Sequence, residues 1–135
     1  MRRLFLFSLL LFVAQTEEKF KIRITPVPLD GAMRAAVAGS GSGSASLSGS
    51  KLTINASFDG LPSPAIAAKI HKGVATGVRG SAFLDLTVTK STKGTVSGTF
   101  DLTPDQLDSL KKGQLYLQIS SEKSPDGTVW GWILK

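Results

Sequence analysis

The sequence contains no cysteine, which excludes disulfide bonds, thiolate metal sites and a lipid-modified N-terminal cysteine. It has a single histidine and a single tyrosine in 135 residues. No apolar run approaches the roughly 20 residues that a membrane-spanning helix needs. A chain of this length has room for one domain, so its stability must come from an ordinary packed core.

The basic residues are also not gathered into a patch. The formal net charge is +6, but the lysines and arginines are scattered among acidic residues, and the largest cluster in the body of the chain is Lys111-Lys112. Proteins that bind nucleic acid concentrate their positive charge on one helix or groove, with aromatic residues between the cations. The sequence therefore predicts no nucleic-acid partner and leaves room for weak binding to anionic polymers.

The start of the chain is typical of a signal peptide. A short basic beginning is followed by the apolar run Leu4–Val13, which has no amphipathic period and so does not favour the alternative, a buried helix of the fold. We predict a signal peptide over residues 1–16, cleaved between Ala14 and Glu17, and a single domain over residues 17–135. The protein is then exported, periplasmic or extracellular, and not inserted in the membrane after the leader is removed.

Several stretches show the period-2 alternation of half-buried β-strands. The glycine-serine run over residues 38–44 is at first sight a flexible linker. Alternation resumes on both sides of the turn at Ser48-Gly49-Ser50, however, so its second half is better interpreted as part of a hairpin. The predicted strands cover residues 19–28, 45–47, 52–58, 81–89, 95–102, 115–119 and 128–134, with a turn over 124–127 before the last one.

One short helix is predicted over about 104–112. Thr103 is suited to cap it, Pro104 fits its first position, and Gln106 completes a capping box. Gly113 follows as a stop signal. Together with the strands, this predicts an all-β fold, a Greek-key-like β-sandwich or flattened barrel of seven or eight antiparallel strands, with the helix before the final hairpin.

The stretch Phe58–Gly73, FDGLPSPAIAAKIHKG, contains a Gly-Leu turn followed by the strand Ala68–Gly73. This order resembles the CHRD (chordin) domain, in which a Gly-Leu turn leads into an Ala-His-Ile-His-x-Gly strand. The resemblance covers roughly residues 19–135. Further family elements appear in the same order at Ser97-Gly98-Thr99, Thr103–Leu110, Leu115–Ile119 and Pro125–Ile133.

The family's histidines are mostly missing, which makes this chain a divergent member. Lys69 stands at the first position of the His-x-His pair, His71 at the second, and Ser120 replaces the histidine of the later strand that contains Tyr116. Two imidazoles on one face would suit copper or zinc, but one imidazole does not make that site. We therefore predict no metal, no cofactor and no enzymatic activity, with His71 hydrogen-bonded at a strand end.

The closing strand carries apolar side chains on both of its faces. Val129, Gly131 and Ile133 match apolar and glycine positions of the resembling family, whereas the other face matches its arginine and glutamine positions. That second face consists of Trp130, Trp132 and Leu134. We interpret it as a partner-binding surface. The alternative is that the N-terminal segment folds over the indoles through Val27, Leu29 or Met33.

These observations predict a secreted or periplasmic, non-catalytic CHRD-like binding or assembly module. It would engage a protein partner, or another copy of itself as a homo-oligomer, through its C-terminal strand. Two alternatives stay open at this point. One is a metal-binding redox protein similar to superoxide dismutases, and the other is an envelope module that binds anionic glycans.

Overall fold

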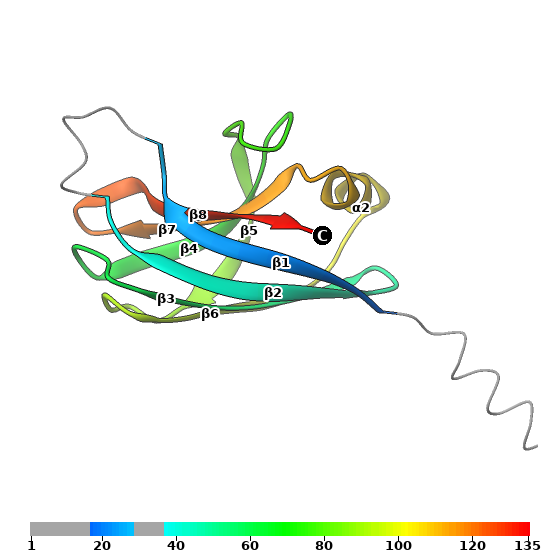
Figure 1. The fold of residues 1–135 in the computed structure, drawn as a ribbon. Helices are drawn as coiled ribbons and strands as arrows, with labels where there is room; N and C mark the ends of the chain where they lie inside the picture. The colour runs from blue at the N-terminus through cyan, green and yellow to red at the C-terminus, as the bar shows by residue number, and fades with distance from the viewer. Residues whose placement is uncertain (1–16, 29–36) are drawn as a thin grey trace, which may run out of the picture.

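The computed structural model describes residues 17–28 and 37–135, and within them the chain forms a closed antiparallel β-barrel with one short helix (Figure 1). The all-β prediction is confirmed. The elements are β1 Glu17–Pro26, β2 Ser40–Ser48, β3 Lys51–Asp59, β4 Ala65–Lys72, β5 Ser81–Val88, β6 Gly94–Asp101, α2 Pro104–Lys111, β7 Leu115–Ser121 and β8 Ser124–Leu134. The predicted signal peptide, and also Leu29 and Met33, lie outside the described residues.

The order of strands around the barrel differs from their order in the chain. It runs β1-β2-β3-β6-β5-β4-β7-β8, and β8 returns to pair with β1. Consecutive hairpins supply β1-β2-β3, while β3 pairs with β6 and β4 pairs with β7 across the chain. These crossed connections are of the Greek-key kind that the strand pattern predicted.

The barrel interior is filled by the alternate apolar residues of its strands. Phe20, Ile22 and Ile24 of β1 point inward, while the residues between them face solvent. The central members of the core have no exposed surface: Leu52, Ile54, Ile70, Leu115, Leu117, Ile119, Val129 and Ile133. Period-2 alternation was therefore a correct guide to the inner face of the closing strand.

The glycine-serine run is a strand and not a linker, and this strand begins earlier than predicted, at Ser40. Gly41 and Gly43 lie on the same face as the buried Ala45 and Leu47. A Cβ atom on Gly43 would collide with Ala56 of β3, and a Cβ on Gly41 would collide with the Ser57 carbonyl oxygen. Glycine is required here because two strands approach too closely for any side chain.

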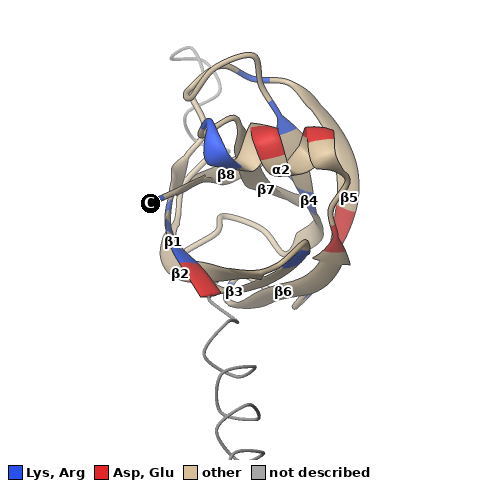
Figure 2. Ribbon diagram, turned by 90° about the vertical axis from the view of Figure 1, so that its right-hand side faces the viewer, with Lys and Arg blue, Asp and Glu red and all other residues tan. Residues whose placement is uncertain are grey.

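The helix α2 forms as its capping signals predicted, and it ends at Lys111, one residue before the expected boundary. The Thr103 Oγ1 accepts the backbone N–H of Gln106 at 3.2 Å, and the Gln106 Oε1 accepts the backbone N–H of Thr103 at 2.9 Å. Leu110 is buried in the barrel core, so α2 lies across one end of the barrel (Figure 2). No helix in the described ranges has the length and apolar character to cross a bilayer.

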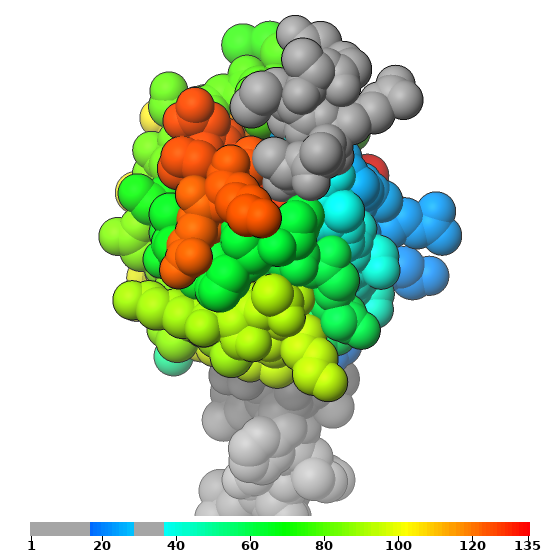
Figure 3. Space-filling model, turned by 90° about the vertical axis from the view of Figure 1, so that its left-hand side faces the viewer, coloured from blue at the N-terminus to red at the C-terminus, as the bar shows by residue number. Residues whose placement is uncertain are grey.

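At the opposite end of the barrel, connections that are distant in sequence lie side by side (Figure 3). The Leu61 N–H donates to the Thr92 carbonyl at 3.1 Å, and the Lys123 N–H donates to the Ser63 Oγ at 2.9 Å. The β3–β4, β5–β6 and β7–β8 connections are thereby fixed relative to one another.

The last hairpin turns earlier than the sequence suggested. The turn lies at Glu122-Lys123, and the predicted turn Ser124–Gly127 is the first part of β8. The Ser124 Oγ donates to the Gly127 carbonyl at 2.7 Å, and the register shifts between Ile119 and Ser121. The turn-forming residues thus form an irregularity inside a strand, because the serine side chain satisfies the backbone there.

Candidate functional site

The residues singled out in the sequence meet on the outer face of β4, β7 and β8. His71 pairs with Tyr116, which pairs with Trp132, so these side chains form one row across the strands. Lys69 pairs with Gln118, which pairs with Trp130, and these form the next row. Adjacent rows lie two residues apart along each strand, so both point to the same side of the sheet.

His71 is held by contacts at the end of β4. Its ring stacks on Tyr116, with the centroids 4.9 Å apart and the planes at 20°. Its Nδ1 lies 2.9 Å from the Gly80 carbonyl oxygen, so this nitrogen carries the proton and donates. The prediction of a hydrogen-bonded histidine at a strand end is confirmed.

Tyr116 anchors the loop between β4 and β5 to the same face. Its hydroxyl accepts the Gly80 N–H at 2.9 Å and donates to the Gly80 carbonyl at 3.1 Å. The loop is fixed at two further points, where Thr76 Oγ1 donates to the Gly113 carbonyl at 2.6 Å and Gln114 Nε2 donates to the Val74 carbonyl at 3.0 Å. Tyr116 is 1% exposed, so it is a structural support and not a surface group.

The two tryptophans pack edge to face, with ring centroids 5.4 Å apart and planes at 75°. Trp132 lies 4.4 Å from Tyr116 by the same measure. Val27 and Val37 join them, and Trp130 is 8% exposed. Val27, one of the three residues that we considered as a cover for the indoles, therefore does contact this cluster.

We call the group Val27, Val37, Tyr116, Trp130 and Trp132 the outer aromatic cluster. It is a second apolar core that lies outside the barrel wall. Within the described residues the Trp132 Nε1 is buried without a hydrogen-bond acceptor. The sequence hypothesis that Trp130, Trp132 and Leu134 contact a partner stays a prediction, and the exposed member of the three is Leu134, at 38%.

The remaining family positions have local roles. Lys69 lies 3.8 Å from the Asp85 carboxylate in an exposed ion pair. Ser120 is half-buried and pairs with Ala67. In the row of Lys69 and Trp130, Gln118 is 7% exposed and its Nε2 donates to the Asp126 carbonyl at 3.2 Å.

A groove of about 600 Å³ runs along β1 and β8 beside the outer aromatic cluster. Ile22, Trp132 and Leu134 form its apolar part. Among the described residues that line it, the cations are Lys21, Arg23 and Lys135, and there is no aspartate or glutamate. The ion pairs found among the described residues include neither Lys21 nor Arg23. We call this feature the β1–β8 groove.

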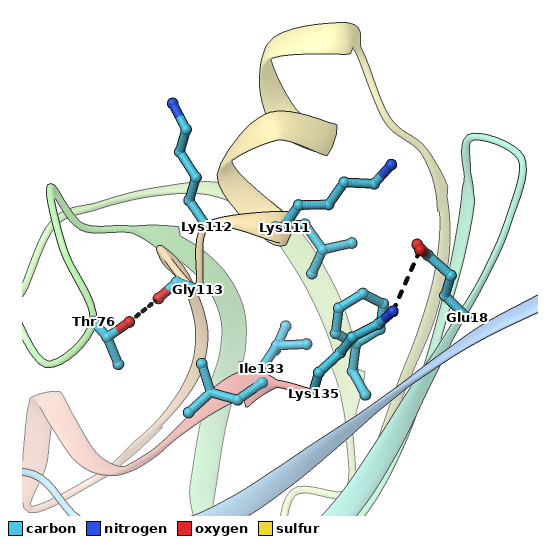
Figure 4. Close-up of a pocket in the computed structure, with 10 residues that line it drawn as sticks. Glu18, Thr76, Lys111, Lys112, Gly113, Ile133 and Lys135 are labelled. Carbon is cyan, nitrogen blue, oxygen red and sulfur yellow. Dashed lines mark hydrogen bonds and ion pairs between the residues drawn. The ribbon is translucent and has the colours of Figure 1, made fainter.

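A second hollow of about 570 Å³ lies where α2 ends (Figure 4). Its lining includes Lys111, Lys112 and Lys135 together with the carboxylate of Glu18. Lys135 Nζ lies 3.4 Å from Glu18 Oε1, so this acid is neutralised. The hydrogen bond to Asp108, at 2.8 Å, raises the pKa of Lys112 above its ordinary value. A lysine whose pKa is raised stays charged at neutral pH, which makes Lys112 a poor acid–base catalyst.

The described residues contain no group of three or more histidine, cysteine, aspartate or glutamate side chains that would hold a metal ion. The single imidazole of the chain also uses its Nδ1 to bond Gly80. The surfaces that the described residues present beside the outer aromatic cluster and at the end of α2 are apolar and cationic.

The family model of the CHRD domain matches residues 25–133, and the chain belongs to this family. No curated protein matches the chain significantly, and no solved structure does. Membership of this family suggests an extracellular or periplasmic module. CHRD domains are generally non-enzymatic.

Sequence reasoning missed the contacts that fix the β4–β5 loop. Nothing near Gly80 indicates that its N–H and carbonyl both bond one phenol, since Tyr116 lies 36 residues further along the chain. A signal did exist at Tyr116 itself. It is the only tyrosine in the sequence, in a strand whose other face is apolar.

Proposed function

We propose that this protein is an exported, non-catalytic binding module that engages a protein partner through the β1–β8 groove. The observation that carries the proposal is the combination of an exposed Leu134 with Lys21 and Arg23 in one groove whose described lining contains no aspartate or glutamate. An apolar anchor surrounded by charge of one sign is typical of a protein interface.

The charge of the groove identifies the partner's chemistry. Lys21 and Arg23 are exposed and lie on the same outer face of β1. Lys21 pairs with Leu134 across the closing ladder, so cation and apolar anchor are neighbours. A complementary ligand carries acidic residues around an apolar side chain, and we assign the groove to an acidic, extended segment of a partner protein.

A glycan fits this groove less well, although its charge would also suit an anionic polymer. Sugars stack on a free aromatic face, whereas the Trp132 ring is packed against Tyr116 at 4.4 Å and against the edge of Trp130. An exposed leucine side chain also has no hydrogen-bonding group that could recognise a sugar. Trp130, at 8% exposure, supports the groove from beneath and does not line it.

The test is site-specific photo-crosslinking on the native envelope. A photoreactive residue at Lys21 samples the β1–β8 groove, and the same residue at Asn55, exposed on β3, is the matched control. We expect a protein adduct from position 21, reduced by Leu134→Ala and by moderate salt, and none from position 55. Leu134→Ala should change the free energy of unfolding by less than about 0.5 kcal/mol, because the side chain is on the surface.

Three results would contradict the proposal. Equal adducts from both positions would mean that the groove has no special role. Retention on a sulfated polysaccharide column at moderate salt, without any protein adduct, would assign the groove to glycans. An adduct with the mass of two copies would make the partner a second copy of this chain.

A further inference from the structure

The barrel has one weak seam, between β5 and β6. Their ladder contains only the pairs Thr87↔Ser97 and Val88↔Val96, whereas eight pairs join β3 to β6. In Figure 2, β5 meets β6 only near its arrowhead and rises away from it toward α2. In the described structure, residues 81–86 of β5 therefore pair with β4 alone, and their other edge is free.

Apolar side chains are accessible along this seam. Phe83, Leu84 and Phe100 pack against the barrel core, yet all are only half-buried, while Leu52 and Ile54 of the same core have no exposure. The seam is thus the place where the described core is open to solvent. Covering these side chains would release water from apolar surface.

Apart from a register shift in the β4–β5 ladder between Ile70 and His71, the free edge has little of the protection by which monomeric proteins prevent strand pairing. Edge strands are normally protected by lysine or proline. Between Ser81 and Leu86 there is neither, and the only charge is that of Asp85, whose carboxylate lies 3.8 Å from Lys69 of the same chain. This edge is therefore suited to accept another strand.

We propose that the strand is β5 of a second copy of this chain, paired antiparallel about a two-fold axis. The direction of the backbone groups limits the register. The Thr89 N–H donates toward β6 at 3.0 Å, and because this direction alternates along a strand, the N–H and carbonyl of Asp85 also face the free edge. A register that opposes Asp85 to Asp85 is disfavoured by like charge.

The register without that clash places Leu84 opposite Leu84, with Phe83 opposite Asp85. Apolar Ala82 then faces Leu86, and the intermolecular ladder ends there, because Thr87 already pairs with Ser97 of β6. In this register the β5 edge is self-complementary, as a two-fold interface requires. For this reason we assign the edge to a second copy of the chain. The proposal does not depend on the β1–β8 groove, which lies on other strands.

One strand pair buries less surface than a large permanent interface, so we expect a reversible dimer. The two Leu84 residues form a non-hydrogen-bonded pair, in which Cα atoms are about 4.5 Å apart, within the range of a disulfide. Because the chain has no cysteine, Leu84→Cys introduces a single thiol. The matched controls are Asn55→Cys on the outer face of β3 and Leu134→Cys in the β1–β8 groove.

The experiment combines oxidation of these variants with sedimentation equilibrium of the native protein. We expect concentration-dependent dimers and a disulfide-linked dimer from Leu84→Cys alone. Asp85→Pro removes an N–H that the monomer's own β4–β5 ladder does not use. Because edge hydrogen bonds are lost, the dissociation constant of the dimer should rise roughly tenfold or more. Asp85→Ala controls for the lost charge, and thermal unfolding of both variants verifies folding.

A native protein that stays monomeric at its highest soluble concentration would overturn the proposal. So would dimers that link through Leu134→Cys or Asn55→Cys and not through Leu84→Cys. If Asp85→Pro fails to fold, the cysteine variants still decide the matter. A dimer here leaves the crosslinking expected at Lys21 unchanged, so the two proposals fail independently.

Discussion

The two faces of the sheet formed by β4, β7 and β8 are built in different ways. The inner face is aliphatic, and its members Ile70, Leu117 and Ile119 have no exposed surface. The outer face carries the outer aromatic cluster, with tilted and edge-to-face rings, a phenol bonded to a loop, and Val27 from just after the end of β1. The inner side chains need only apolar neighbours, whereas the outer ones need particular partners. Packing of the first kind follows from local alternation, and packing of the second kind depends on contacts that are distant in sequence.

The largest effect should come from the inner face. Leu117→Ala leaves a cavity between strands that are bonded on both sides, so we expect the free energy of unfolding to fall by about 4 kcal/mol. Denaturant titration measures this change. A loss below about 1 kcal/mol would mean that the barrel interior is loosely packed and would remove the basis of the comparison.

A smaller loss should follow from Trp130→Ala in the outer aromatic cluster. The indole is 8% exposed, but it lies near the molecular surface, where water can fill the vacated space, so we expect about 3 kcal/mol. Trp130→Phe should restore part of that loss. If Trp130→Ala costs more than Leu117→Ala, the outer cluster and not the barrel interior is the main core.

The smallest effect should come from the hydrogen bonds of the Tyr116 hydroxyl on the outer face. Tyr116→Phe keeps the ring but removes the hydroxyl that bonds both the N–H and the carbonyl of Gly80, at an expected cost of about 1–2 kcal/mol. Hydrogen exchange should show faster exchange of the Gly80 amide, while the amide of Leu117 is unchanged. Unaltered exchange at Gly80 would mean that the other loop contacts hold it without the phenol.

Most of the fold was readable from the sequence because its signals are local. The capping box of α2 and the alternation of β1 are set by residues a few positions apart, and both predictions are confirmed. The irregular start of β8 was not predicted, since the segment Ser124–Gly127 has ordinary turn composition. The segment forms part of a strand because the hydroxyls of Ser124 and Thr128 bond backbone carbonyls within it. Residue composition alone does not reveal these bonds.

The candidate site was only partly predictable. Alternation placed Trp130 and Trp132 together on one face of the closing strand, and the family pattern indicated Lys69 and His71. The meeting of these rows on one surface depends on β4 pairing with β7, a long-range choice that no local pattern determines. The cations of the β1–β8 groove were counted in the sequence as scattered charge, because the neighbours of Lys21 in the fold come from the other end of the chain.

The pairing of β1 with β8 also sets an order of events during synthesis. Lys21 and Leu134 belong to one ladder, so the barrel has no closed state until its final strand has left the ribosome. Until then β1 is held only by β2, and the apolar interior has no wall on that side. An unfinished chain of this topology therefore stays open. The position of a single strand in the barrel thus makes late folding a property of the architecture.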